Sequence, residues 1–216
     1  MNGEIVALRV EVGKPGRVRV VLQGGPSFTL ARSVAGRLEL GQQLEPAEVE
    51  KLQQLDRQER GLQHALRLLS RRPRSEQELR LALQRRRLGE TDSEAVMERL
   101  RQGGWLEDLA FARAWIENRQ DFRPRSSRAL RFELKQKGVA PDIIEAALQD
   151  FDEARAAEAA AQAGVRKYAA LPEDLFRQRL AGYLSRRGFD YSTIAPLVTR
   201  LWRERERLTE ESEGTR

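Results

Sequence analysis

The sequence contains no cysteine and a single histidine, His64. Disulfides, thiolate nucleophiles and cysteine metal sites are therefore excluded, and one histidine cannot form a histidine pair or a two-histidine metal site. The simplest interpretation of His64 is a partly exposed helix residue. The adjacent carboxylates Glu107 and Asp108 point apart at the start of a helix, and no GxxxxGKS phosphate loop is present. We predict a protein that is not an enzyme and has no metal or cofactor.

Long apolar runs are also missing. No run approaches the ~18 residues of a membrane span, and the N-terminus lacks the apolar stretch of a signal peptide. These absences predict a cytoplasmic protein. Of the 216 residues, 40% are hydrophobic and 33% are charged, which favours one or two domains with a thin core and a large charged surface.

The formal net charge is +6, and the positive charge is unevenly distributed. Residues 67–87 contain only two acidic residues, Glu76 and Glu78. The basic residues of this segment are Arg67, Arg71, Arg72, Arg74, Arg80, Arg85, Arg86 and Arg87. Such clustering favours an acidic partner. The alternative for any single arginine is an ordinary solvated surface residue.

An internal repeat with a period of about fifty residues organises the chain after the N-terminal segment. The repeated apolar triplets are Leu79, Leu83 and Leu88; Leu130, Leu134 and Val139; and Leu180, Leu184 and Phe189. The segment that precedes each of the first two triplets also recurs, as Arg72-Pro73-Arg74-Ser75 and Arg123-Pro124-Arg125-Ser126. A repeat of this length predicts small helical units that bury their apolar faces against one another. We expect three helices in each unit.

Helix boundaries are marked by capping residues. The expected start signals are Ser75 with Glu78, Thr91 with Glu94, Asp108, Ser126 or Ser127, Pro141, Pro172 and Ser192. Gly138 is expected to end its helix in the left-handed conformation, and Gly188 closes the equivalent helix of the last unit. An alanine-rich helix is expected over residues 152–168.

The first forty-odd residues alternate as strands do. Val6, Leu8, Val10 and Val12 predict a first half-buried strand, residues 13–16 a turn, Val18 to Leu22 a second strand, and Phe28 with Leu30 a short third one. So small a sheet needs a cover, which we expect from residues 34–40 and a helix opened by Pro46.

These patterns predict a mainly α protein: three tandem three-helix repeats in an array, preceded by a small β segment with a covering helix. The expected divisions are 1–56 for the N-terminal extension, 57–106, 107–150 and 151–208 for the repeats, and 209–216 for a disordered tail. We expect a monomer.

A basic stripe is predicted on the second helix of the second repeat. Arg128, Arg131 and Lys135 stand at i, i+3 and i+7, on one face, while Leu130 and Leu134 face elsewhere. The full candidate set for binding an acidic partner is Arg71, Arg72, Arg74, Arg80, Arg85, Arg86, Arg87, Arg123, Arg125, Arg128, Arg131, Lys135, Lys137, Arg186 and Arg187.

Two other classes of function remain open. One is a stand-alone helix-turn-helix regulator of transcription, although the third helices, residues 93–101 and 141–149, are acidic or apolar rather than suited to reading bases. The other is a nuclease that depends on a metal. Trp105, Trp115 and Trp202 are better explained as core residues than as base-stacking platforms.

Three segments together resemble one known family: the run ALRLLSRRPRSEQEL over residues 65–79, the run over residues 105–119 with Asp108, Phe111 and Arg119, and YLSRRGF over residues 183–189. In this order and spacing they resemble the RecX regulators of the RecA recombinase.

The resemblance implies a row of three three-helix repeats in an elongated, curved array that lodges in the groove of the RecA filament on single-stranded DNA. It implies a mostly negative regulator in DNA repair, recombination and the SOS response, which limits filament growth, ATP hydrolysis, strand exchange and cleavage of the SOS repressor. Direct binding to single-stranded and possibly double-stranded DNA is also implied.

Overall fold

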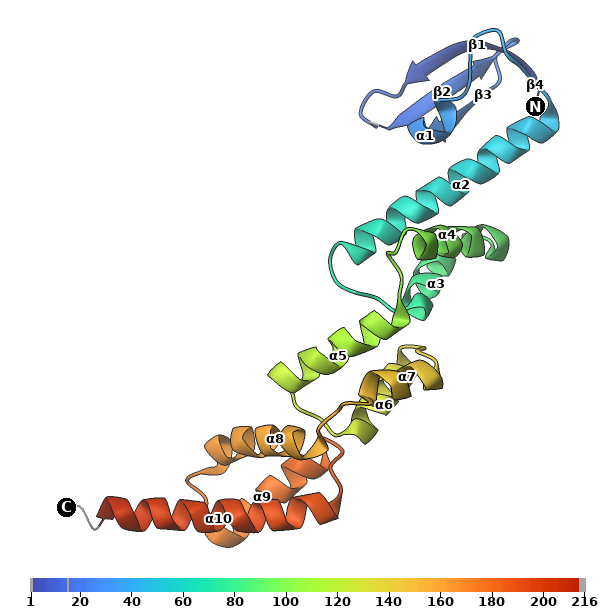
Figure 1. Cartoon of the computed structure of the whole chain (residues 1–216). Coiled ribbons are helices and arrows are strands. Elements are labelled where there is room, and N and C mark those ends of the chain that lie inside the picture. The colour runs from blue at the N-terminus through green and yellow to red at the C-terminus, as the bar shows by residue number, and fades with distance from the viewer. Residues whose placement is uncertain (1, 15, 214–216) are drawn as a thin grey trace. The chain divides into compact units, whose positions relative to one another are not determined.

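The computed structural model describes residues 2–14 and 16–213, with side chains up to residue 208. The chain divides into two compact units, Met1–Glu107 and Asp108–Arg216. The first contains a small sheet and helices α1 to α4, and the second contains helices α5 to α10 (Figure 1). The chain is therefore mainly helical with a small N-terminal β segment, as the sequence predicted.

The N-terminal sheet has the strand order β3-β2-β1-β4 and is antiparallel. Its strands are β1 (Gly3–Val10), β2 (Arg17–Leu22), β3 (Ser27–Ala31) and the two-residue β4 (Gln43–Leu44). Ile5, Val20, Leu22 and Leu30 are buried on one face. The short helix α1 (Arg32–Ala35) and the start of α2 supply the cover, since Ala35 and Val49 join the same apolar cluster.

The predicted inward face of the first strand is confirmed at Leu8, which packs against the buried cluster, but is wrong at Val6 and Val10. A β-bulge between Ile5 and Ala7 shifts the register against β2, so Ile5 enters the core instead of Val6. Val10 is exposed, and Val12 lies beyond the end of β1 and is also exposed. Alternation in the sequence located the strand but could not locate the extra residue that reverses its faces.

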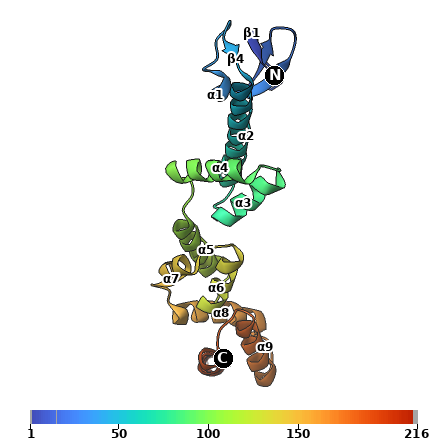
Figure 2. The same ribbon diagram turned by 90° about the vertical axis from the view of Figure 1, so that its right-hand side faces the viewer.

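Helix α2 (Pro46–Leu69) is continuous across the boundary expected at residues 56 and 57, which was therefore misplaced. Pro46 occupies the first turn, and Glu45 and Glu48 form a reciprocal capping box. The helix leads from the sheet to α3 (Glu76–Arg85) and α4 (Glu90–Gln102), as both ribbon views show (Figures 1 and 2). The covering helix of the sheet and the first helix of repeat one are thus a single element.

Asp56 joins this helix to the sheet. The buried carboxylate accepts from the Ala31 backbone N–H at 2.7 Å and from Arg17 Nη1 at 2.5 Å, and it pairs with Arg60 one turn later at 3.1 Å. A buried charge needs several partners to offset its lost hydration. These contacts fix the N-terminal half of α2 against β3.

The first repeat buries Leu79 and Leu83 of α3 against Val96, Met97 and Leu100 of α4. Ser75 caps α3 as predicted, accepting from the Glu78 backbone N–H at 3.2 Å. The capping box predicted for Thr91 was wrong, because α4 begins earlier, with Gly89 as its N-cap.

In the second unit, α5 (Asp108–Phe122), α6 (Ser127–Gln136) and α7 (Pro141–Leu148) form the second repeat. Ser126 caps α6 by accepting from the Ala129 backbone N–H at 3.1 Å, and Pro141 opens α7, both as predicted.

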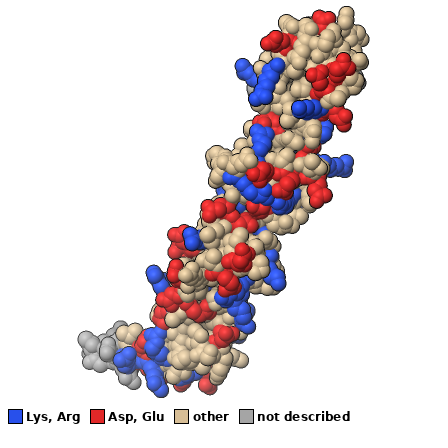
Figure 3. Space-filling view, turned by 45° about the vertical axis from the view of Figure 1, so that its right-hand side comes forward, with Lys and Arg blue, Asp and Glu red and all other residues tan. Residues whose placement is uncertain are grey.

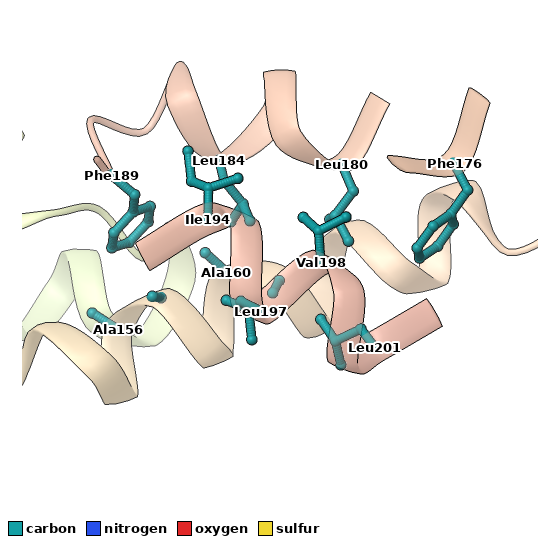
Figure 4. Close-up of a cluster of buried hydrophobic side chains, with 12 residues drawn as sticks. Ala156, Ala160, Phe176, Leu180, Leu184, Phe189, Ile194, Leu197, Val198 and Leu201 are labelled. Atoms are coloured by element: carbon teal, nitrogen blue, oxygen red, sulfur yellow. The ribbon is translucent and has the colours of Figure 1, made fainter. Parts of the chain in front are cut away.

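The third repeat contains α8 (Glu153–Tyr168), α9 (Glu173–Ser185) and α10 (Tyr191–Glu213). Alanines 156, 157, 160 and 161 form the buried face of α8, and their small side chains allow close packing against Leu180 and Leu184 of α9. Ile194 and Val198 of α10 complete this core (Figure 4). Part of the disordered tail expected from residue 209 is instead helical, because α10 continues to Glu213, and residues 214–216 lie outside the described residues.

The second helix of each repeat ends in the same hydrogen-bonded motif. The amide donors and carbonyl acceptors are Leu88 to Leu83 at 3.2 Å, Val139 to Leu134 at 3.1 Å, and Phe189 to Leu184 at 3.4 Å. In each case the preceding residue is left-handed, with φ of 59° at Arg87, 77° at Gly138 and 91° at Gly188. The repeated apolar triplets therefore reflect one repeated helix ending, and the first repeat has an arginine where the others have glycine.

Candidate acidic-partner interface

The predicted stripe lies on the outer face of α6. Leu130 and Leu134 are fully buried, whereas Arg128, Arg131 and Lys135 are at the surface, as helical spacing requires. The predicted buried face of α6 is therefore confirmed.

Two residues of the stripe already have partners within their own unit. Arg131 forms a bidentate pair with Glu145 of α7, at 2.7 and 3.0 Å, which raises the pKa of Arg131 and lowers that of Glu145. Arg128 donates to the Gly188 carbonyl at 3.1 Å and lies 3.6 Å from Asp190. Exposed pairs of this kind contribute only ~0–1 kcal/mol, so both arginines can exchange their partners for a stronger acidic ligand.

An aromatic side chain that the sequence analysis overlooked lies on the same surface. Phe132 is 63% exposed, one turn after Arg128 and just before Lys135. Lys135 itself has no ion pair among the contacts of the described side chains. Phe132 stands four residues after Arg128, and this helical spacing could have placed the ring on the same face from the sequence alone. A cationic surface with an exposed ring can contact both the phosphates and the bases of a single strand.

Other predicted residues are held in ion pairs that support the repeats. Arg72 pairs with Glu78 at 2.9 Å and Arg80 with Glu94 at 2.9 Å. In the second repeat Glu133 accepts from Arg125, Arg119 and the Trp115 indole N–H, at 2.9, 2.8 and 2.7 Å. Arg125 therefore fixes the approach to α6.

A third group lies against aromatic rings or the backbone. The Arg187 guanidinium lies 3.5 Å from the centre of the Tyr183 ring, and its partial burial there lowers the pKa of Arg187. Lys137 lies 4.9 Å from the centre of the Trp115 ring. Arg74 faces the Leu68 carbonyl at 3.5 Å. These contacts position the side chains at the ends of helices.

The remaining candidates have no ion pair in the described part of the chain: Arg71, Arg85, Arg86, Arg87, Arg123, Lys135 and Arg186. Arg86 and Arg87 meet arginines of α2 around a groove in the first unit. In the second unit, Arg186 lines a hollow of about 740 Å³ with Lys167 and Arg179. The structure thus gathers some predicted residues into clusters but distributes the set over both units.

Acidic side chains lie between the basic ones over much of the visible surface (Figure 3). The positive charge therefore does not cover the surface evenly, and it is left unneutralised only in local clusters whose arginines lack acidic neighbours. Within residues 2–14 and 16–213, no group of three or more His, Asp or Glu side chains is arranged to hold a metal ion. None of the described helices is both long and apolar enough to cross a membrane.

The fold and surface define a helical-repeat protein with separate cationic clusters. A family model described as "RecX, first three-helix domain" matches residues 62–100, and one described as "RecX, second three-helix domain" matches residues 108–148.

Proteins named "Regulatory protein RecX" are similar in sequence to this chain. The protein of Prosthecochloris aestuarii is 39% identical over 106 residues, which cover 48% of this chain and 68% of that protein. The protein of Chlorobium limicola is 38% identical over 45% of this chain and 61% of its own length. The protein of Streptomyces coelicolor is 36% identical over 54% of this chain and, again, 61% of its own length. The chain therefore belongs to the RecX family.

Solved structures confirm the fold. A crystal structure of regulatory protein RecX superposes with a TM-score of 0.71 at 24% identity, covering 91% of this chain and 98% of that one. RecX from Lactobacillus salivarius gives a TM-score of 0.58 at 19% identity, over 68% of this chain and 97% of that one.

Proposed function

We propose that this chain is a non-enzymatic, mostly negative modulator of the RecA recombinase. In this proposal it binds as a cytoplasmic monomer in the groove of the RecA filament on single-stranded DNA and limits filament growth, ATP hydrolysis and strand exchange. Membership of the RecX family supports a regulatory role. Cleavage of the SOS repressor would fall with the loss of filament.

The observation that carries the proposal is the outer surface of α6, with Arg128, Phe132 and Lys135 on adjacent turns. The buried pair Leu130 and Leu134 holds the helix so that this face is presented to solvent. Arg131 is paired with Glu145 at the edge of the same surface and would exchange that partner on binding. We propose that this surface contacts the filament.

The experiment measures RecA ATP hydrolysis on single-stranded DNA with and without the chain at stoichiometric ratios. The wild-type chain should depress the rate, and a variant with Arg128→Glu, Arg131→Glu and Lys135→Glu should not. An unchanged rate with the wild-type chain would contradict the regulatory function. Full inhibition by the triple variant would instead remove the α6 surface from the mechanism.

A charge swap supplies the matched control. Arg131→Glu combined with Glu145→Arg restores the ion pair seen at 2.7 Å while reversing the charge on α6. Its unfolding midpoint should match the wild type, whereas its inhibition should stay weak, as for Arg131→Glu alone. Phe132→Ala tests the ring separately, because loss of base stacking is worth ~1–3 kcal/mol per base.

Salt titrations identify the chemistry of the contacts. If the surface touches phosphate, the slope of log affinity against log salt should fall by about 0.7 on single strands for each phosphate that a variant no longer binds. Contacts with acidic protein side chains follow no such counterion rule. Tight binding to selected duplexes in a gel-shift would favour the alternative of a stand-alone transcription regulator.

A further inference from the structure

The two edges of the N-terminal sheet differ, and the β3 edge is closed. The Ala31 N–H donates to Asp56 at 2.7 Å, and the Thr29 carbonyl accepts from Arg17 Nη2 at 2.9 Å. Both backbone groups are therefore already bonded, by side chains of α2 and β2. Sheets commonly close their edges in such ways, because an open edge is a template for another strand.

The β1 edge, in contrast, is open along its second half. Strand β4 pairs only with the first two residues of β1, and no described strand lies beside residues 7–10 on that side. The Glu11 N–H faces β2, where it donates to the Arg17 carbonyl at 3.0 Å. Because successive residues of a strand direct their backbone groups to opposite sides, the N–H and C=O groups of Leu8 and Val10 point to the open edge.

The inner face of this edge is apolar and incompletely covered. Leu8 packs against the buried cluster of the sheet, and Val10, two residues later on the same face, is 65% exposed. Val12, just beyond the end of β1, is fully exposed. An apolar side chain placed beside Val10 would therefore extend the core of the sheet and remove exposed apolar surface from water.

The outer face of the same edge carries a positive charge without a partner. Arg9 stands directly opposite Arg19 in the ladder, and like charges in that position destabilise a sheet. Arg19 is compensated by Glu11 at 3.0 Å, whereas Arg9 forms no ion pair with any described residue. Both arginines line a hollow of about 340 Å³ in which Glu11 is the one acidic residue. A carboxylate brought beside Arg9 would offset this repulsion.

We propose that the open half of β1 binds an extended segment of a partner protein by strand addition, and that this segment carries an acidic residue between two apolar ones. In antiparallel addition, Leu8 and Val10 would each exchange two backbone hydrogen bonds with an apolar residue of the segment. Arg9 would occupy the non-hydrogen-bonded pair between them, where side chains approach most closely, opposite the acidic residue. This inference goes beyond the regulation of RecA and does not depend on it.

A second copy of the chain fits this edge less well. Antiparallel pairing of Leu8 with Val10 of a second copy would place the two Arg9 side chains directly opposite each other. The apolar-acidic-apolar run around the end of β1 is Val10, Glu11 and Val12, but Glu11 is already paired within the sheet and Val12 lies beyond the strand. Charge and register therefore favour a different protein.

The main experiment titrates the full chain into a short fluorescein-labelled peptide with the central run Thr-Val-Glu-Val-Thr and follows anisotropy. A peptide with lysine in place of glutamate should bind more weakly by roughly two- to fivefold, as expected for a cross-strand charge pair. Arg9→Glu should reverse this preference. Arg113→Glu is the matched control, because it makes the same charge change at an exposed residue of α5 and should keep the preference. Equal affinity of the wild type for both peptides, or binding of neither, would overturn the proposal.

Backbone pairing is tested separately from charge. N-methylation of both valines of the peptide removes the donors that would face Leu8 and Val10, and it should weaken binding by roughly tenfold or more. Val10→Pro removes an N–H that faces the open edge rather than β2, so it should weaken binding while the melting temperature stays close to that of the wild type. Unchanged affinity for the methylated peptide would refute strand addition, whatever the stability of Val10→Pro.

Two further measurements test other occupants of the edge and other sites for the peptide. In sedimentation equilibrium, a dimer of the full chain that Val10→Pro dissociates would assign the edge to a second copy and overturn the proposal; a monomer is expected. The variant with Arg128→Glu, Arg131→Glu and Lys135→Glu should keep the preference for the glutamate peptide, and loss of that preference would assign the peptide to the α6 surface. Inhibition of RecA is measured separately, so failure of the edge and failure of the regulatory function are distinguishable.

Discussion

Replacement of Gly188 by alanine should disrupt the junction between the second and third repeats. Gly188 has φ of 91° and ends α9 directly against the start of α6. A Cβ atom there would collide with the Ser126 hydroxyl and lie 2.8 Å from Ala129 Cβ. The Ser126 backbone N–H also donates to the Arg187 carbonyl at 3.1 Å, so the loop cannot retreat without breaking that bond.

Two costs contribute to the loss of stability. A left-handed alanine costs roughly 1–2 kcal/mol, and overpacking a close contact costs typically 1–3 kcal/mol more. We therefore expect Gly188→Ala to lower the free energy of unfolding by about 2–5 kcal/mol. Gly104 provides the control, because it ends α4 with φ of 68° and the same hydrogen-bonded motif but has nothing within 4 Å of its Cβ position. Gly104→Ala should cost about 1–2 kcal/mol.

The assay is urea unfolding of the full chain, followed by far-ultraviolet circular dichroism and tryptophan fluorescence. Trp202 packs on Phe176 with ring centres 5.4 Å apart, so the third repeat contributes to the fluorescence signal, together with Trp105 and Trp115. Equal losses for the two variants would refute the reasoning, because they would mean that Gly188 does not lie against Ser126 and that only backbone strain matters.

Three further predictions concern buried or paired groups. Asp56→Ala should cost about 3–5 kcal/mol in urea unfolding, because it leaves the Ala31 N–H and Arg17 without their partner; a loss below 1 kcal/mol would contradict this role. Leu134→Ala, at a fully buried position, should cost ~2–5 kcal/mol, and an unchanged melting curve would contradict the repeat register. Hydrogen bonds from Arg101 lower the pKa of Glu76 below its ordinary value of 4.5, so the stability it adds is present at neutral pH and lost as pH falls through the lowered pKa. The difference in unfolding midpoint between wild type and Glu76→Gln should therefore shrink in acid, and a constant difference from pH 7 to pH 3 would refute it.

Much of the helical fold could be predicted because its signals are local. The triplets at Leu79, Leu130 and Leu180 mark one face of a helix by spacing alone, and Ser75 and Ser126 cap their helices through backbone groups three residues away. Such signals depend on neighbours in the chain and survive without knowledge of the packing.

Features that depend on distant neighbours were missed. The bulge after Ile5 depends on pairing with β2, and the attachment of α2 to the sheet depends on Asp56 meeting Ala31 and Arg17, far apart in the sequence. The sequence shows a helical period on both sides of residue 56 but contains no local sign that both halves are one helix.

The candidate site shows the same contrast between what local sequence predicts and what distant neighbours decide. By itself the sequence determined that arginines are concentrated near the second helix of each repeat, and helical spacing placed Arg128, Arg131 and Lys135 on an outer face. Only the tertiary structure decided that Arg131 faces Glu145, that Arg125 is held by Glu133, and that Arg86 meets Arg60 and Arg67 in a groove. The physical reason is that charge is a property of a residue, whereas its availability depends on which opposite charges the fold brings within a few ångströms.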